Sequence, residues 1–428
     1  MTWPATKLKW AATTIAGGTP SVSEPSYWAE NGDTNGLDWV SISDMSGRPS
    51  VTATGRRVSL EGTRAARLPI GDAGTLIMSM YASLGHTAFL TRRASWNQAI
   101  LGIIPSVTYD SHFLKYALEA IKPTLREIAR SNTQANLNAE QVGNLAIPNP
   151  PPGEQRRIAD FLDTETTRID QLSTSRRRQI SALDERELAV IAEMLAGGAT
   201  QDNGQPTGWP WLPHIPTDWK IGPVYAYYLT ELGKMLNSDR ASGDRQLPYL
   251  RNANVHWHEI DSSDMATMHF DPAEAQRYSV KAGDLLVCEG GAGVAEAAVW
   301  DGRIDECYFQ KSLHRVRQDG PLPVEWLMFW LRFAKSCGVF EADGNIATIP
   351  HLTGEQLREY RIPIPSDAQD RVAKTVRALT AMGDARAHLK QAQALLAERR
   401  QALITAAVTG QFDVSTASGR NVTDGVHA

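Results

Sequence analysis

The sequence predicts an α+β protein in which two mixed α/β domains are separated by two long helices that pair as an antiparallel coiled coil. One observation is a repeat, because LNAEQVGNLAIPNP from Leu137 aligns without gaps to LTGEQLREYRIPIP from Leu352. A second is that a long proline-free segment rich in Ala, Leu, Gln, Arg and Glu follows each copy, at about 154–196 and 368–408. The order is therefore globular, helical, globular, helical, with an internal pseudo-two-fold repeat.

The two globular regions are expected at residues 1–150 and 201–365. Both combine short β-branched or apolar runs with Gly and Pro punctuation and one helical stretch, at 111–129 and 324–334. Such a mixture is typical of α+β domains. The string GTLIMS from Gly74 lines up with GDLLVC from Gly283, and Gln98 with Gln310 further on, which extends the repeat.

The helical segments are expected at 151–200 and 366–410, with a disordered tail at 411–428. Roughly 40 helical residues span on the order of 60 Å, more than one compact domain covers on every side. The two apolar stripes match in length, which favours pairing of the helices with each other. The alternative, two amphipathic helices that each lie on their own domain, stays open. The residues expected in the coiled-coil seam are Ile158, Leu162, Ile169, Leu172, Leu183, Val372, Val376, Leu379, Leu389, Leu396 and Leu403.

Composition narrows the class of protein. A chain of 428 residues with 42% hydrophobic residues can build more than one core. Three scattered cysteines do not make a disulfide framework, and no stretch approaches the roughly 18 apolar residues of a membrane span. We therefore expect a cytoplasmic protein without a membrane partner. The net charge of −5 argues against coating of nucleic acid by bulk charge, so DNA affinity would come from local patches.

Three motifs of enzyme or metal chemistry are incomplete. Asn149-Pro150-Pro151 is followed by Pro152, where an amino-methyltransferase needs an aromatic residue to stack on a flipped base. The glycines of GAGVAE from Gly291 precede a segment too short for a crossover helix, which favours a tight turn. His256, His258 and His269 lack a carboxylate at ligand spacing. We expect no catalytic residue, no metal and no cofactor.

Several strings resemble the specificity subunits of type I restriction-modification systems, the HsdS family. GGTPSVSEPSYW from Gly17 and IPTDW from Ile215 look like the starts of the two target recognition domains of that family. IPNPPPGEQRRIADFLDTETTRID from Ile147 is similar to the start of its first spacer helix, and ERRQALITAAVTGQFDV from Glu398 to the end of its second. The second helix start, IPIPSDAQDRV, keeps Gln369 but loses the glutamate.

The resemblance covers nearly the whole chain, and it implies a function without catalysis. Each globular region would read one half of a split site in double-stranded DNA. The paired helices would set the distance between the half-sites and bind two methyltransferase subunits, and through that complex the restriction and translocase subunits. Two other classes stay open: a self-contained DNA methyltransferase, and a coiled-coil adaptor without DNA specificity.

Residues that could contact DNA are those whose donors reach base edges or phosphates from turns. Arginine, lysine, asparagine and histidine side chains near Gly and Pro punctuation meet this condition in both globular regions. The candidates are Arg56, Arg57, Arg92, Arg93 and Asn97 in the first, and Arg251, Asn252, Asn254, His256, Lys311 and Arg315 in the second.

Overall fold

The computed structural model describes residues 3–30, 33, 35–81, 83–125, 137–236, 242–342 and 351–416. The chain divides into two compact units, and each contains part of both long helices. The first unit comprises residues 1–176 and 390–428, and the second comprises residues 177–389. Each unit is described separately below.

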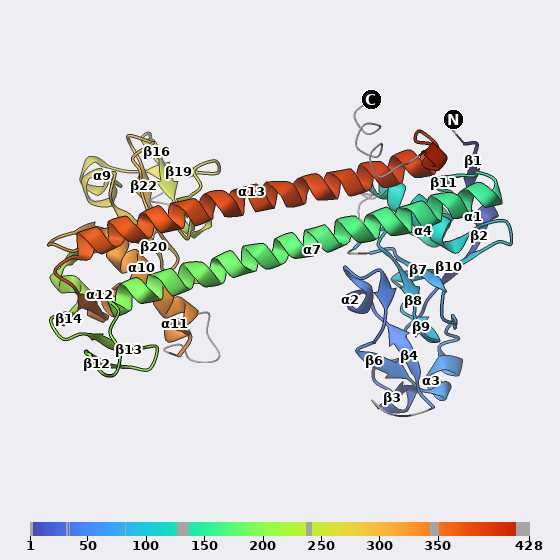
Figure 1. The fold of residues 1–428 in the computed structure, drawn as a ribbon, viewed down its shortest axis with the longest axis horizontal. Helices are drawn as coiled ribbons and strands as arrows, with labels where there is room; N and C mark the ends of the chain where they lie inside the picture. The colour runs from blue at the N-terminus through green and yellow to red at the C-terminus, as the bar shows by residue number, and fades with distance from the viewer. Residues whose placement is uncertain are drawn as a thin grey trace. The chain divides into compact units, whose positions relative to one another are not determined.

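The first unit contains two sheets and a small strand pair (Figure 1). Its central sheet has the order β2 (Ala12–Ala16), β10 (Ile100–Pro105), β7 (Leu76–Ser79), β8 (Thr87–Leu90) and β5 (Ser50–Val51). Its outer sheet has the order β3 (Trp28–Ala29), β6 (Arg56–Val58), β4 (Leu37–Val40) and β9 (Ala94–Trp96), and β1 (Ala5–Lys7) pairs with β11 (Ala146–Pro148). The short helices are α1 (Leu8–Ala11), α2 (Ile42–Met45), α3 (Leu60–Ala65), α4 (Ser111–Ala120), α6 (Ala139–Gly143) and the 3₁₀ turns η1 (Pro25–Tyr27) and η4 (Val414–Thr416).

The central sheet of the first unit is buried on both faces. Successive side chains of a strand point to opposite faces, so Leu76 and Met78 of β7 join a core formed with α4, whereas Ile77 joins a core on the other side. That second core includes Trp96 of the outer sheet. A Cβ at Gly102 would lie 2.2 Å from the Trp96 ring, so only glycine lets β10 approach this closely.

The second unit is built on the same plan. Its central sheet has the order β15 (Tyr228–Leu232), β23 (Leu313–Gln318), β20 (Leu285–Cys288) and β21 (Ala297–Val299). The other sheets are β19 (Ala266–His269) with β16 (Gln246–Leu250) and β22 (Tyr308–Phe309), β14 (Lys220–Pro223) with β24 (Arg361–Ile364), β12 (Gly204–Trp209) with β13 (Leu212–Pro216), and β17 (Val255–His256) with β18 (Glu259–Ile260). The short helices are α9 (Pro272–Tyr278), α10 (Val324–Ser336), α11 (Val339–Ala342), α12 (Gly354–Glu359) and the 3₁₀ turns η2 (Val224–Ala226) and η3 (Asn252–Asn254).

The two units share strand order and turn geometry. The antiparallel order β2-β10-β7-β8 matches β15-β23-β20-β21. Before β7 and β20, Gly74 and Gly283 adopt φ angles of 89° and 88°, a region that favours glycine. Their N–H groups donate to the carbonyls of Leu90 and Trp300, at 2.8 Å in both cases. The alignment of GTLIMS with GDLLVC therefore joins segments of the same local structure.

The repeated motif also forms the same local structure twice. Asn138 and Thr353 cap α6 and α12 by accepting from the N–H groups of Gln141 and Gln356, whose side chains accept from the cap N–H in return. The strand that follows each helix then pairs with the first strand of its region, β11 with β1 and β24 with β14. The glutamine that both copies contain is thus a capping residue.

The equivalence of Gln98 and Gln310 is shifted by one residue in the structure. Asn97 N–H donates to Val40 O, and Gln310 N–H donates to Leu250 O, after strand pairs that are parallel in both units. A Cβ at Gly17 would lie 2.2 Å from Asn97 O, and one at Gly233 would lie 2.2 Å from Gln310 O. Asn97 is therefore the structural counterpart of Gln310. The two residues correspond through their backbone hydrogen bonds and the close approach of a glycine, and not through their side-chain amides.

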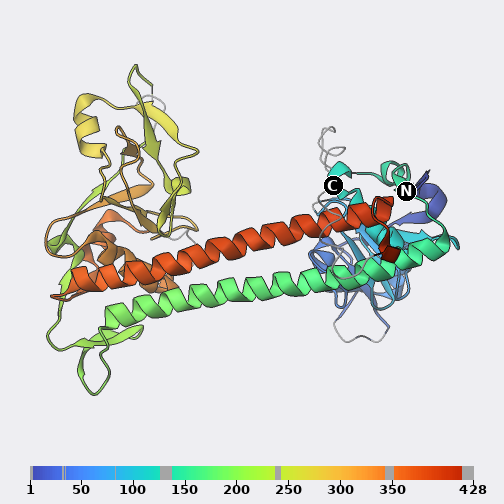
Figure 2. The same cartoon turned by 45° about the horizontal axis from the view of Figure 1, so that its top comes forward.

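The two long helices were correctly predicted from the sequence. They are α7 (Pro152–Ala196) and α13 (Ala368–Thr409). In the first unit their segments lie side by side and run in opposite directions (Figures 1 and 2). Arg400 Nε lies 3.3 Å from Asp170 Oδ1, and Gln393 Nε2 donates to Ser173 O at 3.5 Å.

In the second unit the helices meet at Glu187, a buried residue of α7. Its carboxylate accepts from Arg386 of α13 at 2.7 Å and from Arg332 of α10 at 3.1 Å. His258 Nε2, in the turn between β17 and β18, lies 3.4 Å away. Burial acts to raise the pKa of Glu187, but the hydrogen bonds from His258 and Arg386 outweigh it and the pKa is about 2. Four elements are therefore joined at one charged group.

Burial divides the predicted seam residues into three groups. Ile158, Leu162, Ile169, Val372 and Leu403 are buried, and Leu183, Leu379, Leu389 and Leu396 are half-buried. The prediction was wrong for Leu172 and Val376, whose exposed fractions are 44% and 40%. The stripe drifts around a straight helix because 3.6 residues per turn do not match a repeat of 3.5. Thr375 consequently takes the buried position beside Val376.

Two further boundaries differ from the sequence prediction. Helix α4 ends at Ala120, because Pro123 lacks the N–H that would donate to Glu119; residues 122–125 are helical again, and the expected end near 129 lies outside the described residues. The expected disordered tail lies outside the described residues at 417–428, but Phe412 packs on Phe161 with ring centroids 5.7 Å apart. Within the described part of the chain, no helix combines the length and apolar character needed to cross a membrane.

Gln155 closes the start of α7 in the first unit. Its side chain is fully buried, accepts from Asp110 N–H at 2.8 Å and donates to Pro150 O at 3.0 Å and to Thr108 O at 3.2 Å. Gln369, its counterpart at the start of α13, is exposed. The same residue type therefore has a structural role at only one of the two helix starts.

We expect Gln155→Ala to destabilise the first unit by roughly 2–4 kcal/mol, because it leaves buried backbone groups without partners. Gln369→Ala is the matched control and should change stability by about 0.5 kcal/mol or less. Hydrogen exchange of amides in the first unit measures both effects. Equal exchange in the two variants would contradict the role assigned to Gln155.

Glu187→Gln should lower the stability of the second unit at neutral pH by up to about 3 kcal/mol. Because the folded pKa lies below the ordinary value, this contribution is complete above pH ~5 and is lost as the pH falls towards ~2. The difference in melting temperature between wild type and variant should shrink over that range. Asp184→Asn removes an exposed partner of the same Arg386 and should cost less than about 1 kcal/mol. A difference in melting temperature that does not change with pH would contradict the role assigned to Glu187.

Candidate nucleic-acid interface

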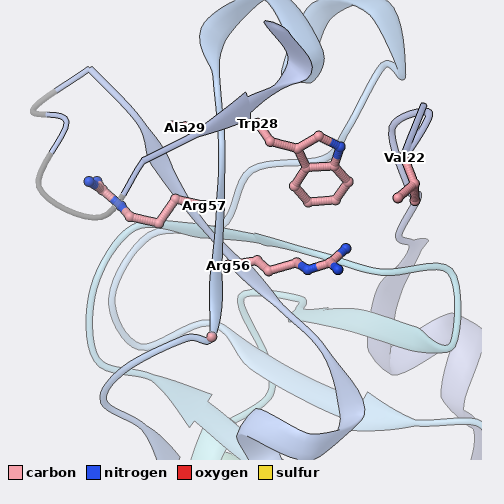
Figure 3. A pocket seen from close by; sticks show the side chains of 6 residues that line it. Val22, Trp28, Ala29, Arg56 and Arg57 are labelled. Atoms are coloured by element: carbon pink, nitrogen blue, oxygen red, sulfur yellow. The ribbon is translucent and has the colours of Figure 1, made fainter. Parts of the chain in front are cut away.

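Four arginines of the first unit lie around two hollows at the outer sheet. One hollow, of about 350 Å³, is lined by Val22, Trp28, Ala29, Gly55, Arg56 and Arg57 (Figure 3). The other, of about 380 Å³, is lined by Gly36, Asp38, Ala53, Thr54, Arg57, Arg92 and Arg93. We call Arg56, Arg57, Arg92 and Arg93 the arginine cluster. The structure thus brings together four of the five candidates predicted in this unit.

Arg57 is held by the protein itself. Its Nε lies 3.1 Å from Oδ1 of the buried Asp38, and its two terminal nitrogens donate to the carbonyls of Asp33 and Gly36. A guanidinium group with all three nitrogens engaged has little capacity left for a ligand. Arg57 therefore organises the wall that both hollows share.

Arg92 and Arg93 are more open. Arg92 Nε lies 3.5 Å from Asp38 Oδ2 and its Nη2 donates to Thr52 O at 2.6 Å, but the side chain is 62% exposed. Arg93 lies 3.7 Å from Asp72 and is 67% exposed. The Arg93–Asp72 pair is exposed on both sides and contributes little to stability, and both guanidinium groups are open enough to approach phosphate.

Arg56 has a different environment from its neighbour Arg57. Adjacent residues of a strand point to opposite faces, and Figure 3 shows the two side chains directed away from each other. The Arg56 guanidinium lies over the Trp28 ring, with its central carbon 5.2 Å from the ring centroid. Arg56 is thus positioned by an aromatic surface and not by a carboxylate.

Asn97 is separate from the arginine cluster. It follows the end of β9 opposite to Arg93 and lines neither hollow. Its Oδ1 accepts from Ala99 N–H at 3.1 Å, which fixes the turn into β10. A local structural role therefore accounts for this side chain.

In the second unit, two of the candidates are buried. Arg315 is 8% exposed and donates to the carbonyls of Arg277 and Ser279, each at 2.7 Å. Asn254 is 2% exposed and donates to the carbonyls of Asp261 and Asp264. Both side chains donate to backbone carbonyls of their own unit. A structural role therefore accounts for these two residues without a DNA ligand.

The remaining candidates of the second unit lie nearer the surface. Arg251 Nη2 pairs with Asp264 at 2.8 Å, and His256 Nδ1 lies 3.7 Å from Glu296. Asn252 donates to Gly290 O at 2.8 Å. Lys311 is half-buried, and its N–H donates to Lys234 O at 2.9 Å. Neighbouring carboxylates reduce the attraction of this surface for a polyanion, in agreement with the acidic composition of residues 201–365.

Two residues of the interface were missed in the sequence. Asp38 lies inside the apolar run of β4, where a charged residue signals a buried partner, and this signal could have identified the pairing with arginine. Trp28 lies in the segment GGTPSVSEPSYW, which indicated only a resemblance to a target recognition domain. No spacing rule connects Trp28 to Arg56, because the two come together through the register that places Trp28 opposite Val58.

The enzyme-like motifs form ordinary structure. Pro152 is the first residue of α7, which is the helix position that proline favours, and Asn149 N–H donates to Pro4 O at 2.8 Å. The glycines from Gly291 lie in a turn in which Val294 N–H donates to Gly291 O, and this turn joins the antiparallel strands β20 and β21. The interpretation of a tight turn is confirmed.

Comparison with known proteins gives matches of different extent. A family model for the type I restriction modification DNA specificity domain matches residues 14–182. The specificity subunit of the type I restriction enzyme MjaIX from Methanocaldococcus jannaschii is 25% identical over 193 residues, 44% of this chain and 43% of that protein. The EcoKI specificity subunit of Escherichia coli K12 is 28% identical over 182 residues, 42% of this chain and 36% of that protein.

The curated matches span about two fifths of each relative's length. A solved structure reported under "Structural basis underlying complex assembly and conformational transition of the type I R-M system" contains a chain with a TM-score of 0.69 and 16% identity. The alignment covers 96% of this chain and 98% of that chain, and it shows a common fold. Residues 14–182 of this chain are therefore similar to the DNA specificity domain of type I restriction-modification systems.

Proposed function

We propose that the chain is the non-catalytic specificity subunit of a type I restriction-modification complex and reads a bipartite site in double-stranded DNA. One recognition domain would be formed by residues 1–150 and the other by residues 201–365. The shared strand order of the two units carries this proposal, because two similar domains in one chain can read two half-sites. The domain matched by the family model lies mainly in the first of them.

The long helices would act as a spacer and as a docking surface. We propose that α7 and α13 pair as an antiparallel coiled coil, which the contacts of Arg400 with Asp170 and of Arg386 with Glu187 support. A pseudo-two-fold repeat would let one subunit bind two identical methyltransferase subunits. Restriction and translocase subunits would join through that complex. Such an assembly acts on DNA in the cytoplasm.

The DNA contacts would fall on the exposed candidates. In the first unit these are Arg56, Arg92 and Arg93, with Arg57 as a structural support. In the second unit they are Arg251, Asn252, His256 and Lys311, with Asn254 and Arg315 as structural supports. The arginine cluster would contribute more of the electrostatic affinity, because its four arginines share two carboxylates, Asp38 and Asp72, whereas Arg251 and His256 each face one.

Methylated bases in a host that expresses the chain with its cognate methyltransferase subunit test the proposal. We expect one split motif with an unread gap. Exchange of residues 1–150 for those of a relative should change one half of the motif and leave the other half and the gap unchanged. Methylation by the chain alone would reveal a missed enzyme, and a stable complex without methylation would favour the adaptor.

The double variant Arg92→Ala/Arg93→Ala should weaken DNA binding of the assembled complex without changing the motif. Loss of two phosphate contacts is expected to reduce the slope of log K against log salt by about 1–2. Arg358→Ala, an exposed arginine of α12 outside both hollows, is the control and should leave the slope unchanged. Filter binding or fluorescence anisotropy over a salt series measures this slope. Equal slopes in wild type, the double variant and Arg358→Ala would count against phosphate contact at Arg92 and Arg93.

A further inference from the structure

Arg56 is the member of the arginine cluster with the fewest bonds to its own protein. Arg57 is bonded by Asp38 and two carbonyls, Arg92 by Asp38 and Thr52, and Arg93 by Asp72. For the Arg56 side chain, the interaction found within the described residues is the one with the face of Trp28. Within the described residues, its five N–H donors, which lie in the plane of the guanidinium group, have no hydrogen bond to the protein.

Trp28 is a rigid support for this group. Its Nε1 donates to Ser21 O at 3.1 Å, which fixes the rotation of the ring. The edge of Trp39 packs against it with ring centroids 5.2 Å apart at 88°, and Trp39 Nε1 donates in turn to Gly18 O at 3.0 Å. Strand pairing with Val58 holds the Trp28 backbone beside β6. The ring therefore restrains the guanidinium plane before any ligand arrives.

The surroundings leave one side of Arg56 open. Arg56 is exposed and lines the hollow of about 350 Å³ that Val22 borders on the far side (Figure 3). Within the described residues, the acidic partners of the cluster, Asp38 and Asp72, bond to the other arginines and not to Arg56. A ligand edge that enters this hollow meets an oriented pair of N–H donors next to an apolar wall.

We propose that Arg56 determines specificity by reading a guanine of the half-site recognised by the first unit, through paired hydrogen bonds to O6 and N7 in the major groove. The inference rests on the proposed function and deepens it. Guanine presents two adjacent acceptors in that groove, and the guanidinium fork matches them in one plane. Orientation by Trp28 favours such a planar partner, since a phosphate contact requires charge at the right distance but no fixed plane.

Arg92 and Arg93 supply charge for phosphate from the other hollow, on the opposite side of Arg57. This arrangement separates two tasks within a few residues. The exposed side chains would attract the DNA backbone, and the restrained one would read a base edge. A phosphate role for Arg56 is the alternative outcome of the experiment below.

The first measurement compares the methylated motif of wild type, Arg56→Ala and Arg56→Lys, each assembled with the cognate methyltransferase subunit. Arg56→Ala should relax one position from guanine to any base in the half that changes on exchange of residues 1–150. Arg56→Lys keeps the charge but loses the fork, and it should relax the same position. The other half-site and the gap stay as in wild type.

The second measurement uses a duplex of the mapped motif in which 7-deazaguanine replaces that guanine. The wild-type complex should bind this duplex about 10- to 100-fold more weakly, because N7 is absent. The Arg56→Ala complex should bind both duplexes equally within about twofold. Inosine at the same position removes only the minor-groove amino group and should leave wild-type binding unchanged, which makes it the matched control.

Three results would overturn the inference while the proposed function stands: a motif that Arg56→Ala leaves unchanged, a uniform loss of affinity without a relaxed position, or a first half-site without a G·C pair. The uniform loss would identify a phosphate contact. Absence of any split motif with the wild-type chain would overturn the proposed function, and this inference with it. The two failures are therefore distinguishable.

Discussion

Burial of the central strands on both faces is the constraint on which each unit depends. The runs LIMS of β7 and LLVC of β20 are apolar at successive positions, so neither face can contact water without cost. In the first unit one face is covered by α4 with the ends of α7 and α13, and the other by the outer sheet. The long helices are consequently part of a globular core and are not appendages to it.

This layering places the proposed docking surface and the proposed reading surface on different faces of the central sheet of the first unit. The helices lie against one face of the central sheet, whereas the arginine cluster belongs to the outer sheet on the other face. Substitutions around Trp28 and Arg56 can therefore change the ligand surface without disturbing Ile158, Leu162 or Leu403 in the helical core.

The sequence predicted the features that depend on local pattern. The two long helices and the correspondence of GTLIMS with GDLLVC follow from residue type and spacing. The exposure of Leu172 and Val376 does not, because it depends on small phase differences accumulated along a helix. The burial of Arg315 and Asn254 was also hidden, since a donor that completes backbone hydrogen bonds has the same residue type as one that binds DNA. The Arg56 side chain reaches the Trp28 ring only through the pairing of β3 with β6 in the folded protein.

The two units are expected to contribute unequally to DNA recognition. The four arginines of the cluster share the two carboxylates of Asp38 and Asp72, whereas Arg251 and His256 each face a carboxylate of their own, Asp264 and Glu296. DNA bound at the second unit must displace or compensate these carboxylates, so net attraction there is weaker and geometry matters more. Tethering to the first unit offsets that weakness, because a second site on the same molecule meets its half-site at a high effective concentration. Under the proposed function, a weakly attracting second domain would reject wrong sequences readily, since little nonspecific affinity would hold it in place.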